Sequence, residues 1–308
     1  MSIFLMLLIA LVLDAVLGEP ETIWDKYPHP ATLMGRAVNW FDETLNQGTL
    51  RRIKGIASIL ALCFAGFIIG WIIQWLPDFG ILEILGAAIL LAHKSLIQHV
   101  EDVADALRSD LHAGRASVSM IVGRDSKQLD ETGVARSAIE SAAENFSDAV
   151  IAPAFWFLLA GLPGILVYKL INTADSMIGY QNKEYGEFGY GAAKLDDLMN
   201  WFPARITAVL ICAANFDWRA FEVVRKDAGM HRSPNAGWPE AAVAGVLNIA
   251  LAGPRSYDGE MNDDPFVNAS GKKDLHANDI EDTVAVINRS WLGLIALLTL
   301  VVLLGWLF

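Results

Sequence analysis

The sequence predicts an all-α integral membrane protein that crosses the bilayer about four times. Of its 308 residues, 54% are hydrophobic and the mean hydropathy is +0.38, which is too apolar for a soluble globular protein. Two runs without a charged residue, Gly55–Leu76 and Trp291–Phe308, are each long enough to cross a hydrocarbon core. Because no internal repeat or long linker is visible, residues 1–308 are expected to form a single membrane-embedded domain.

The apolar pattern places four spanning helices along the chain, near residues 2–18, 55–76, 79–97 and 291–308. The first is interrupted only by Asp14 and lacks the basic start and cleavage site of a signal peptide, so we expect it to be retained. The third carries Glu83 and ends in polar residues. The shorter runs Ile206–Phe216 and Ala241–Gly253 are predicted to be buried or half-membrane helices, and the polar segment Ser256–Asp282 to be a flexible excursion.

The segment Ala149–Tyr168 is apolar enough to span, but it contains helix breakers. Pro153 and the break at Gly161–Gly164 divide it into halves of about ten residues, and each half is too short to cross alone. A re-entrant or buried helical hairpin therefore fits better than a crossing. A hairpin would also return Lys169–Asp197 to the side of the membrane from which the segment entered.

Basic residues indicate the orientation in the membrane. The turn at Pro77–Gly80 carries none, whereas the segments after the first span and after the third are rich in them: Lys26, Arg36, Arg51, Arg52 and Lys54, then Arg108, Arg115, Arg124, Lys127 and Arg136. By the positive-inside rule, the N-terminus lies outside and residues 98–290 lie at the cytoplasmic face of the cell inner membrane.

Charge and cysteine content exclude several functions. The net charge of −12 argues against nucleic acid as a partner, and it means that local basic residues or a metal must hold any bound phosphate. Two cysteines, Cys63 and Cys212, lie in apolar segments and support neither a disulfide framework nor a metal cluster. We interpret them as core residues.

Three acids share one face of a predicted helix. Glu140, Glu144 and Asp148 follow each other at intervals of four residues, a spacing at which like charges repel unless a cation neutralises them. This pattern favours a site for metal and nucleotide, although a solvated acidic face would have the same spacing. A second polar group follows the next apolar run and lies on or near one helix face: Lys169, Asn172, Asp175 and Ser176. For Lys169, snorkelling to the membrane interface is the alternative.

Further polar motifs fall on the predicted cytoplasmic side, including Glu19, His29, Arg124 with Asp125, Asp196 with Asp197, Arg205, and Ser233 with Asn235. Each alone has an ordinary explanation. His29 stands between prolines as turn residues do, and Ser233 could begin a helix. Asp196, Asp197 and Arg205 could equally fix loop geometry. Together they suggest one shared cytoplasmic site.

The order of these motifs resembles a known family. They read DAVLGEP (Asp14–Pro20), HP (His29–Pro30), VGRD (Val122–Asp125), ESAAEN with DAVIAP (Glu140–Pro153), YKLINTADSMIGY (Tyr168–Tyr180), LDD (Leu195–Asp197), PAR (Pro203–Arg205) and SPNAGWPEAAVAG (Ser233–Gly245). The chain resembles the CbiB/CobD family of cobalamin biosynthesis, the adenosylcobinamide-phosphate synthases. The similarity extends from the first span to about Tyr257. Ala149 is one departure, since the family pattern has Gly there.

This resemblance implies an ATP-dependent ligase that joins aminopropanol, its O-phosphate or a related amino alcohol to a carboxylate of adenosylcobyric acid. ATP and Mg²⁺ are the implied cofactors, and an acyl phosphate is the expected intermediate. No GxxxxGK[ST] motif is present, so the nucleotide site is not a P-loop. The metal ligands would be Glu140, Glu144 and Asp148, and the catalytic residues Glu140, Glu144, Lys169 and Asp175. Substrate and nucleotide would contact Asp14, Glu19, His29, Arg124, Asp125, Asn145, Asn172, Ser176, Asp196, Asp197, Arg205, Ser233 and Asn235.

Two other functions stay open at this point. A secondary transporter for a corrinoid or an anion would also place broken helices and ionisable residues at membrane depth, but the sequence has no inverted repeat. A non-catalytic membrane scaffold is the third alternative. The expected partners are the small-molecule substrates and the lipid bilayer, and association with further copies or with other membrane enzymes of cobalamin synthesis is left open.

Overall fold

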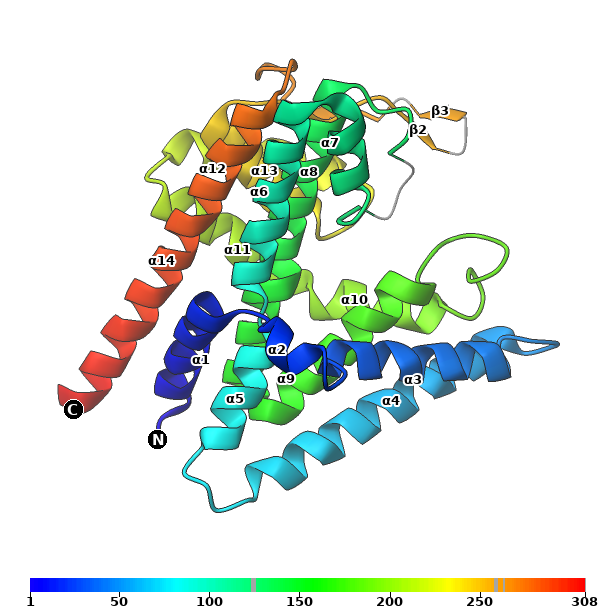
Figure 1. The fold of residues 1–308 in the computed structure, drawn as a ribbon, viewed down its shortest axis with the longest axis vertical. Helices are drawn as coiled ribbons and strands as arrows, with labels where there is room; N and C mark the ends of the chain where they lie inside the picture. Colours follow the sequence, from blue (N-terminus) through cyan, green and yellow to red (C-terminus); the bar gives the residue numbers. More distant parts are fainter. Residues whose placement is uncertain (123–125, 258–259, 263, 308) are drawn as a thin grey trace. The chain divides into compact units, whose positions relative to one another are not determined.

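The computed structural model describes residues 1–122, 126–257, 260–262 and 264–307 (Figure 1). Nearly all regular structure is helical, which confirms the predicted all-α class. The strands in the described part of the chain are short and form two antiparallel pairs. β1 (Leu251–Ala252) pairs with β4 (Phe266–Val267), and β2 (Arg255–Tyr257) pairs with β3 (Glu260–Asn262).

Among the described residues, four helical segments are long and apolar enough to cross a membrane, so the chain is a multi-pass membrane protein. They are α4 (Arg51–Gln74), then Ile81–Ser109 comprising α5 (Ile81–Leu90) and α6 (His93–Ser109), then Glu131–Ile178, and finally α14 (Ala277–Leu307). The expected span near residues 2–18 is not among them. It forms α1 (Ile3–Leu17), whose 15 residues extend only about 22 Å.

The chain divides into two compact units, and both are assembled from separate stretches of sequence. Unit 1 comprises Met1–His93, Asp148–Trp201 and Leu298–Phe308, and unit 2 comprises Lys94–Ser147 and Phe202–Leu297. The expectation of a single domain stays a prediction. Each unit is described separately below.

Unit 1 is organised around α9 (Ala152–Ile178), which contacts α1, α4, α5, α3 (Pro30–Leu45) and α10 (Tyr190–Met199). The short helix α2 (Glu21–Trp24) lies between α1 and α3 in sequence. Glycines explain the close approach of α4, because a Cβ at Gly70 would stand 2.6 Å from the backbone of Pro163 in α9. Figure 1 shows α3 alongside α4, which it also contacts.

The predicted helical hairpin is confirmed. Helical geometry fails at Ala160 (φ −139°, ψ 16°) and at Gly161 (φ 64°, ψ −153°), a conformation that glycine adopts readily. Beyond this break the chain returns, because the Tyr168 hydroxyl donates a hydrogen bond of 2.9 Å to the carbonyl oxygen of Asp148. Twenty residues of straight helix would separate these groups by about 30 Å. The run Glu131–Ile178 is therefore not one straight helix, and the side of the membrane to which it returns stays a prediction.

Unit 2 contains most of α6, α7 (Leu111–Val118), α8 (Glu131–Phe146), most of α11 (Trp201–Ala214), α12 (Trp218–Asp227), the 3₁₀ turn η2 (Ala228–Met230), α13 (Gly237–Leu247) and most of α14. α13 contacts α8, α12, β1 and β4. The short helix expected at Ile206–Phe216 is confirmed as part of α11, whereas the run Ala241–Gly253 is helical only to Leu247, where α13 ends, and continues into β1. Cys212 is buried in α11, as expected of a core residue, and Cys63 in α4 is half-buried.

The predicted excursion at Ser256–Asp282 is only partly correct. β2 and β3 occupy its beginning, and α14 starts at Ala277, well before the apolar run that predicted the last span. The early turns of α14 bury Ile280, Val284 and Ile287, which are spaced as one face of a helix. An amphipathic start of this kind escapes a search for continuous apolar sequence.

Candidate functional site

The predicted site residues fall in both units. Unit 1 holds Asp14, Glu19, His29, Asp148, Lys169, Asn172, Asp175, Ser176, Asp196 and Asp197, and unit 2 holds Glu140, Glu144, Asn145, Arg205, Ser233 and Asn235. Arg124 and Asp125 lie outside the described residues. That all these groups serve one site stays a prediction.

Two breaks in regular α-helix occur around Asp14 in unit 1. α5 stops at Leu90, and α6 begins at His93, where the backbone N–H donates 2.8 Å to the carboxylate of Asp14. The N–H of Ala92, in the gap, donates to the carbonyl of Ala149, which lies in the π-helical turn η1 (Ser147–Ile151). Asp14 is 3% exposed, and its hydrogen bond with the N–H of His93 caps the start of α6. Irregular backbone at membrane depth is tolerated where protein or a cavity covers it, which is typical of binding sites.

The α9 hairpin gathers four predicted residues, which we call the Lys169 cluster: Glu19, His29, Asp148 and Lys169. Lys169 interacts electrostatically with Asp148 and Glu19, and His29 interacts with Glu19 and Lys169. Burial lowers the pKa of His29, the charge of Glu19 acts in the opposite direction, and Lys169 lowers the pKa further. Three separate parts of the sequence therefore supply one polar neighbourhood.

A second network surrounds Asp196 in α10. Its carboxylate accepts hydrogen bonds from the amides of Asn172 at 3.3 Å and Asn200 at 3.0 Å, while the Asn200 carbonyl oxygen accepts from the Tyr168 hydroxyl at 2.9 Å. Burial raises the pKa of Asp196 to about 6, although the two amides oppose the shift. Sequence reasoning missed Asn200, which is 1% exposed. Its position one helical turn after Asp196 is the sequence feature that could have identified it.

The remaining unit 1 predictions have simpler environments. Asp197 forms an ion pair of 2.9 Å with the exposed Lys194, and the Ser176 hydroxyl donates to the backbone of Asn172. Asp175 is half-buried near the end of α9.

The metal site predicted at Glu140, Glu144 and Asp148 stays a prediction, because the first two lie in unit 2 and the third in unit 1. No set of three His, Cys, Asp or Glu side chains in the described part of the chain is arranged to hold an ion. Glu140 is 5% exposed and accepts 2.7 Å from the backbone N–H of Ala252, whereas Glu144 is exposed. Glu140 and Glu144 lie in α8, whereas Asp148 lies in the π turn η1.

In unit 2, Arg205 lies against the SPNAG segment. Its guanidinium stands 4.4 Å from the ring centroid of Trp238 and donates a long hydrogen bond of 3.5 Å to Asn235. The Ser233 hydroxyl accepts from the N–H groups of Asn235 and Ala236, which fits the alternative that Ser233 shapes a turn before α13. Asn145, in α8, donates to the carbonyl oxygen of Ser141 one turn earlier.

Sequence reasoning also missed Glu240 in α13, which is 3% exposed. Its Oε1 lies 3.7 Å from the Nε2 of His231. A single acid in this apolar, alanine-rich stretch is the sequence feature that could have identified Glu240 as a candidate.

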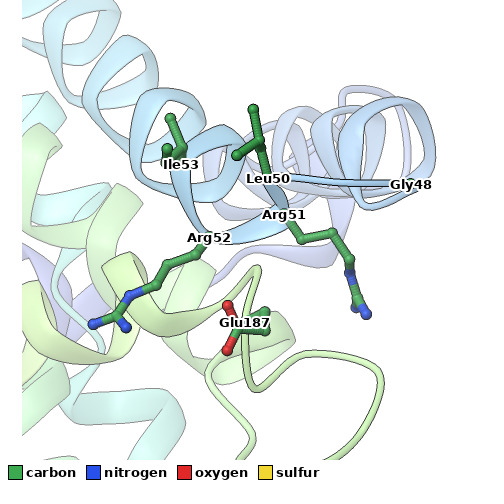
Figure 2. Close-up of a pocket in the computed structure, with 6 residues that line it drawn as sticks. All are labelled: Gly48, Leu50, Arg51, Arg52, Ile53 and Glu187. Carbon is green, nitrogen blue, oxygen red and sulfur yellow. The ribbon is translucent and has the colours of Figure 1, made fainter.

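An open pocket elsewhere in unit 1 contains none of the predicted residues. It is lined by Gly48, Leu50, Arg51, Arg52, Ile53 and Glu187 (Figure 2). Arg51 donates to the side chain of Asn46 and to the carbonyls of Lys183 and Glu184, and Arg52 stands 3.6 Å from the ring centroid of Tyr190. Because Arg51 ties the 180–189 loop to α4 and Arg52 packs on Tyr190 of α10, both guanidinium groups have structural contacts, and the pocket gives no functional assignment.

Comparison with known proteins agrees with the motif order. A profile of the CobD/Cbib protein family matches residues 7–287. The chain is 48% identical to the cobalamin biosynthesis protein CobD of Sinorhizobium fredii, over 98% of each chain, and 49% identical to that of Brucella anthropi, over 90% of each. The protein of the same name from Rhodobacter capsulatus is 42% identical over 99% of each chain. No solved structure matches the chain.

Proposed function

Because this chain belongs to the CobD/Cbib family of cobalamin biosynthesis proteins, we propose that it is an ATP-dependent ligase that forms an amide on the corrin ring. It joins an amino alcohol, free or O-phosphorylated, to a carboxylate of adenosylcobyric acid. The product is adenosylcobinamide or its phosphate. The reaction takes place at the cytoplasmic face of the inner membrane.

The observation that carries this proposal is the Lys169 cluster. A carboxylate is a poor electrophile, so an amide ligase first transfers a phosphoryl group to it, and that transfer needs positive charge at the phosphate oxygens. The hairpin holds the half-buried Lys169 where its ammonium interacts electrostatically with Asp148 and Glu19. In the second step the amine attacks the acyl phosphate, phosphate leaves, and a carboxylate accepts the proton that the amine loses.

The donor set fits a Mg²⁺ ion that arrives with the nucleotide. Mg²⁺ keeps several waters and binds through one or two carboxylates together with substrate phosphates, so a closed group of three protein ligands is not required. Asp148 would hold such an ion in unit 1, and Glu144, which is exposed, is a further candidate ligand. When bound, the ion neutralises the polyphosphate. Lys169 positions the phosphate, and the buried Asp196 network fixes α10 against the end of the hairpin.

The test is direct synthesis. Protein purified in detergent is mixed with adenosylcobyric acid, ATP, Mg²⁺ and either aminopropanol or its phosphate, and ADP and the amide product are measured. ADP release that depends on both the corrinoid and the amine, with a matching amount of amide, is expected. If ATP is not hydrolysed but reconstituted vesicles accumulate corrinoid, the chain is a transporter and the ligase proposal is wrong.

A matched pair of lysine variants tests the role of the cluster. Lys169→Met keeps the aliphatic stem and removes the charge, and it should lower turnover by roughly a hundredfold, the usual scale for loss of a positioned charged group. Lys194→Met removes an exposed lysine from the same unit and should leave turnover close to normal. Equal activity of the two variants would leave only membrane snorkelling as the role of Lys169.

A further inference from the structure

In unit 2, an exposed apolar surface follows α11 and the turn at residues 215–217 that joins it to α12, which we call the α11–α12 corner. Ile206, Val209 and Ala213 are exposed and share one face of α11, since they are spaced by three and four residues. Just beyond the helix, Phe216 is 85% exposed and Trp218 is 72% exposed. Large apolar side chains exposed in one series indicate a surface that meets an apolar partner.

The corner is tied to α14 by the side chain of Asn215. Its amide donates to the carbonyl oxygen of Val286 at 3.4 Å and to the hydroxyl of Ser290 at 3.2 Å. Its oxygen accepts 2.6 Å from the Nε of Arg289. Phe216 follows with φ 54°, a left-handed conformation that is uncommon for a bulky residue. The fold therefore fixes a turn that directs the Phe216 ring outward.

These contacts mark the level along α14 at which its apolar run begins. Arg289 carries the last charged side chain of the sequence, and Trp291–Phe308 follows without a charge. Gly293 also faces the end of α11, because a Cβ there would stand 2.9 Å from the Cβ of Ala214. Since α14 is long and apolar enough to span, the bilayer surface crosses it close to Arg289. The end of α11 and the corner lie at that level.

The direction of α11 follows from its length and from Arg205. Its 14 residues extend about 21 Å, too short to cross a hydrocarbon core. If α11 ran from the corner into the bilayer, Arg205 would lie about 15 Å deeper than Asn215, at a depth where a charged side chain is costly. If it ran away from the bilayer, the stripe from Ile206 to Ala213 would face water. Lying along the surface satisfies both, as amphipathic interfacial helices do.

We propose that α11 lies in the plane of the bilayer surface and that the α11–α12 corner anchors unit 2 to phospholipid. The stripe from Ile206 to Ala213 faces the acyl chains, and the rings of Phe216 and Trp218 lie among the headgroups. Arg289 stands at the level of the lipid phosphates. Aromatic and basic side chains are typical of this depth.

Lipid is the partner that the surface fits because the surface continues into α14. The exposed side chains of Leu292 and Leu297 follow the contact with α11, and they belong to a helix suited to span the membrane. Arg205, beside the stripe, contacts Trp238 and Asn235, so these candidate residues of unit 2 also lie at the membrane surface. The placement holds whichever reaction the protein catalyses, since it depends only on the exposure and charge of unit 2.

The experiment measures the depth of nitroxide labels on the full chain in phosphatidylcholine vesicles. Both native cysteines are replaced by Ala, and a single labelled cysteine is introduced as Ile206→Cys, Ala213→Cys or the control Lys273→Cys. Lys273 is exposed and precedes α14, whose stretch from Ala277 to Arg289 extends about 18 Å, so its label should lie in water. All three positions are exposed, and the labels should leave the thermal midpoint in detergent unchanged.

Power saturation by electron paramagnetic resonance compares collisions with oxygen, which concentrates in lipid, and with a water-soluble nickel complex. The labels at Ile206 and Ala213 should collide severalfold more with oxygen than with nickel, and the label at Lys273 should show the reverse. The two labels on α11 should also lie at the same depth within a few Å. Replacing both aromatic anchors, Phe216→Ser with Trp218→Ser, should shift the label at Ala213 toward water.

Three results would overturn the proposal. Nickel collisions at Ile206 and Ala213 as frequent as those at Lys273 would place the surface in water. Few collisions with either reagent would show that protein, such as a second copy of the chain, covers it. Depths that differ by about 10 Å, the length of the seven residues between the two labels, would show that α11 descends into the bilayer.

Discussion

Replacing Tyr168 with Phe removes one hydroxyl and tests the helical hairpin on which the candidate site depends. Tyr168 has no exposed surface, and its hydroxyl bonds both the Asp148 carbonyl and the Asn200 side chain at 2.9 Å. The ring remains in the variant, so packing changes little. The loss comes from two buried acceptors that share the single hydroxyl proton and that both lose it in the variant. We expect the free energy of unfolding to fall by about 1–3 kcal/mol, because leaving such groups unpaired costs that much.

The assay is equilibrium unfolding in mixed micelles, followed by near-ultraviolet circular dichroism. Tyr180→Phe is the matched control, since Tyr180 lies shortly after the same helix and is 47% exposed. Its unfolding free energy should stay within about 0.5 kcal/mol of the wild type, as is usual for surface changes. A double-mutant cycle with Asn200→Ala should show coupling, because each change removes the same hydrogen bond. Equal stabilities for the Tyr168 and Tyr180 variants would refute the hairpin contact.

Three further predictions follow from the same structure. Since the folded-state pKa of Asp196, about 6, lies above its ordinary value of 3.8, the stability that its protonated form contributes is present below pH 4 and lost as the pH rises through 6. The free energy of unfolding of Asp196→Asn should therefore rise by roughly 2–3 kcal/mol relative to that of the wild type between pH 4 and pH 7. A difference between the two proteins that does not change with pH would contradict this. Arg205→Lys should lower turnover at least tenfold, because Lys lacks the planar group that stacks on the Trp238 indole. Arg219→Lys, at an exposed position, should leave turnover unchanged. Equal small effects of the two variants in kinetic assays would remove Arg205 from the site. Cysteines can be placed at the exposed positions Gln128 and Gln181 in a background without native cysteines. Both should react with a membrane-impermeant thiol reagent added from the cytoplasmic side. Labelling of position 181 from outside alone would show that the hairpin region crosses the membrane.

Much of unit 1 could be predicted because its signals are local. Pro153 and the Gly161–Gly164 break predicted a hairpin, and the structure places the reversal at Ala160 and Gly161. The reversal explains why Lys169 and Asp148, far apart in sequence, share one neighbourhood. Asp14 and His29 were chosen for their motifs, and the structure adds that each caps a helix. A residue type suited to catalysis is often also suited to capping, so the motif alone could not separate the two roles.

The π turn is a feature that sequence periodicity could not predict. The spacing of Glu140, Glu144 and Asp148 was interpreted on the assumption of a continuous α-helix with about 3.6 residues per turn. A π turn begins at Ser147, and such a turn depends on tertiary contacts that periodicity does not encode, here including the bond from Ala92 to the carbonyl of Ala149. The same turn leaves Asp148 on the hairpin side, beside Lys169. Asp148 was chosen for its spacing from Glu140 and Glu144, but its interaction within unit 1 is with Lys169, because the hairpin returns the chain to it.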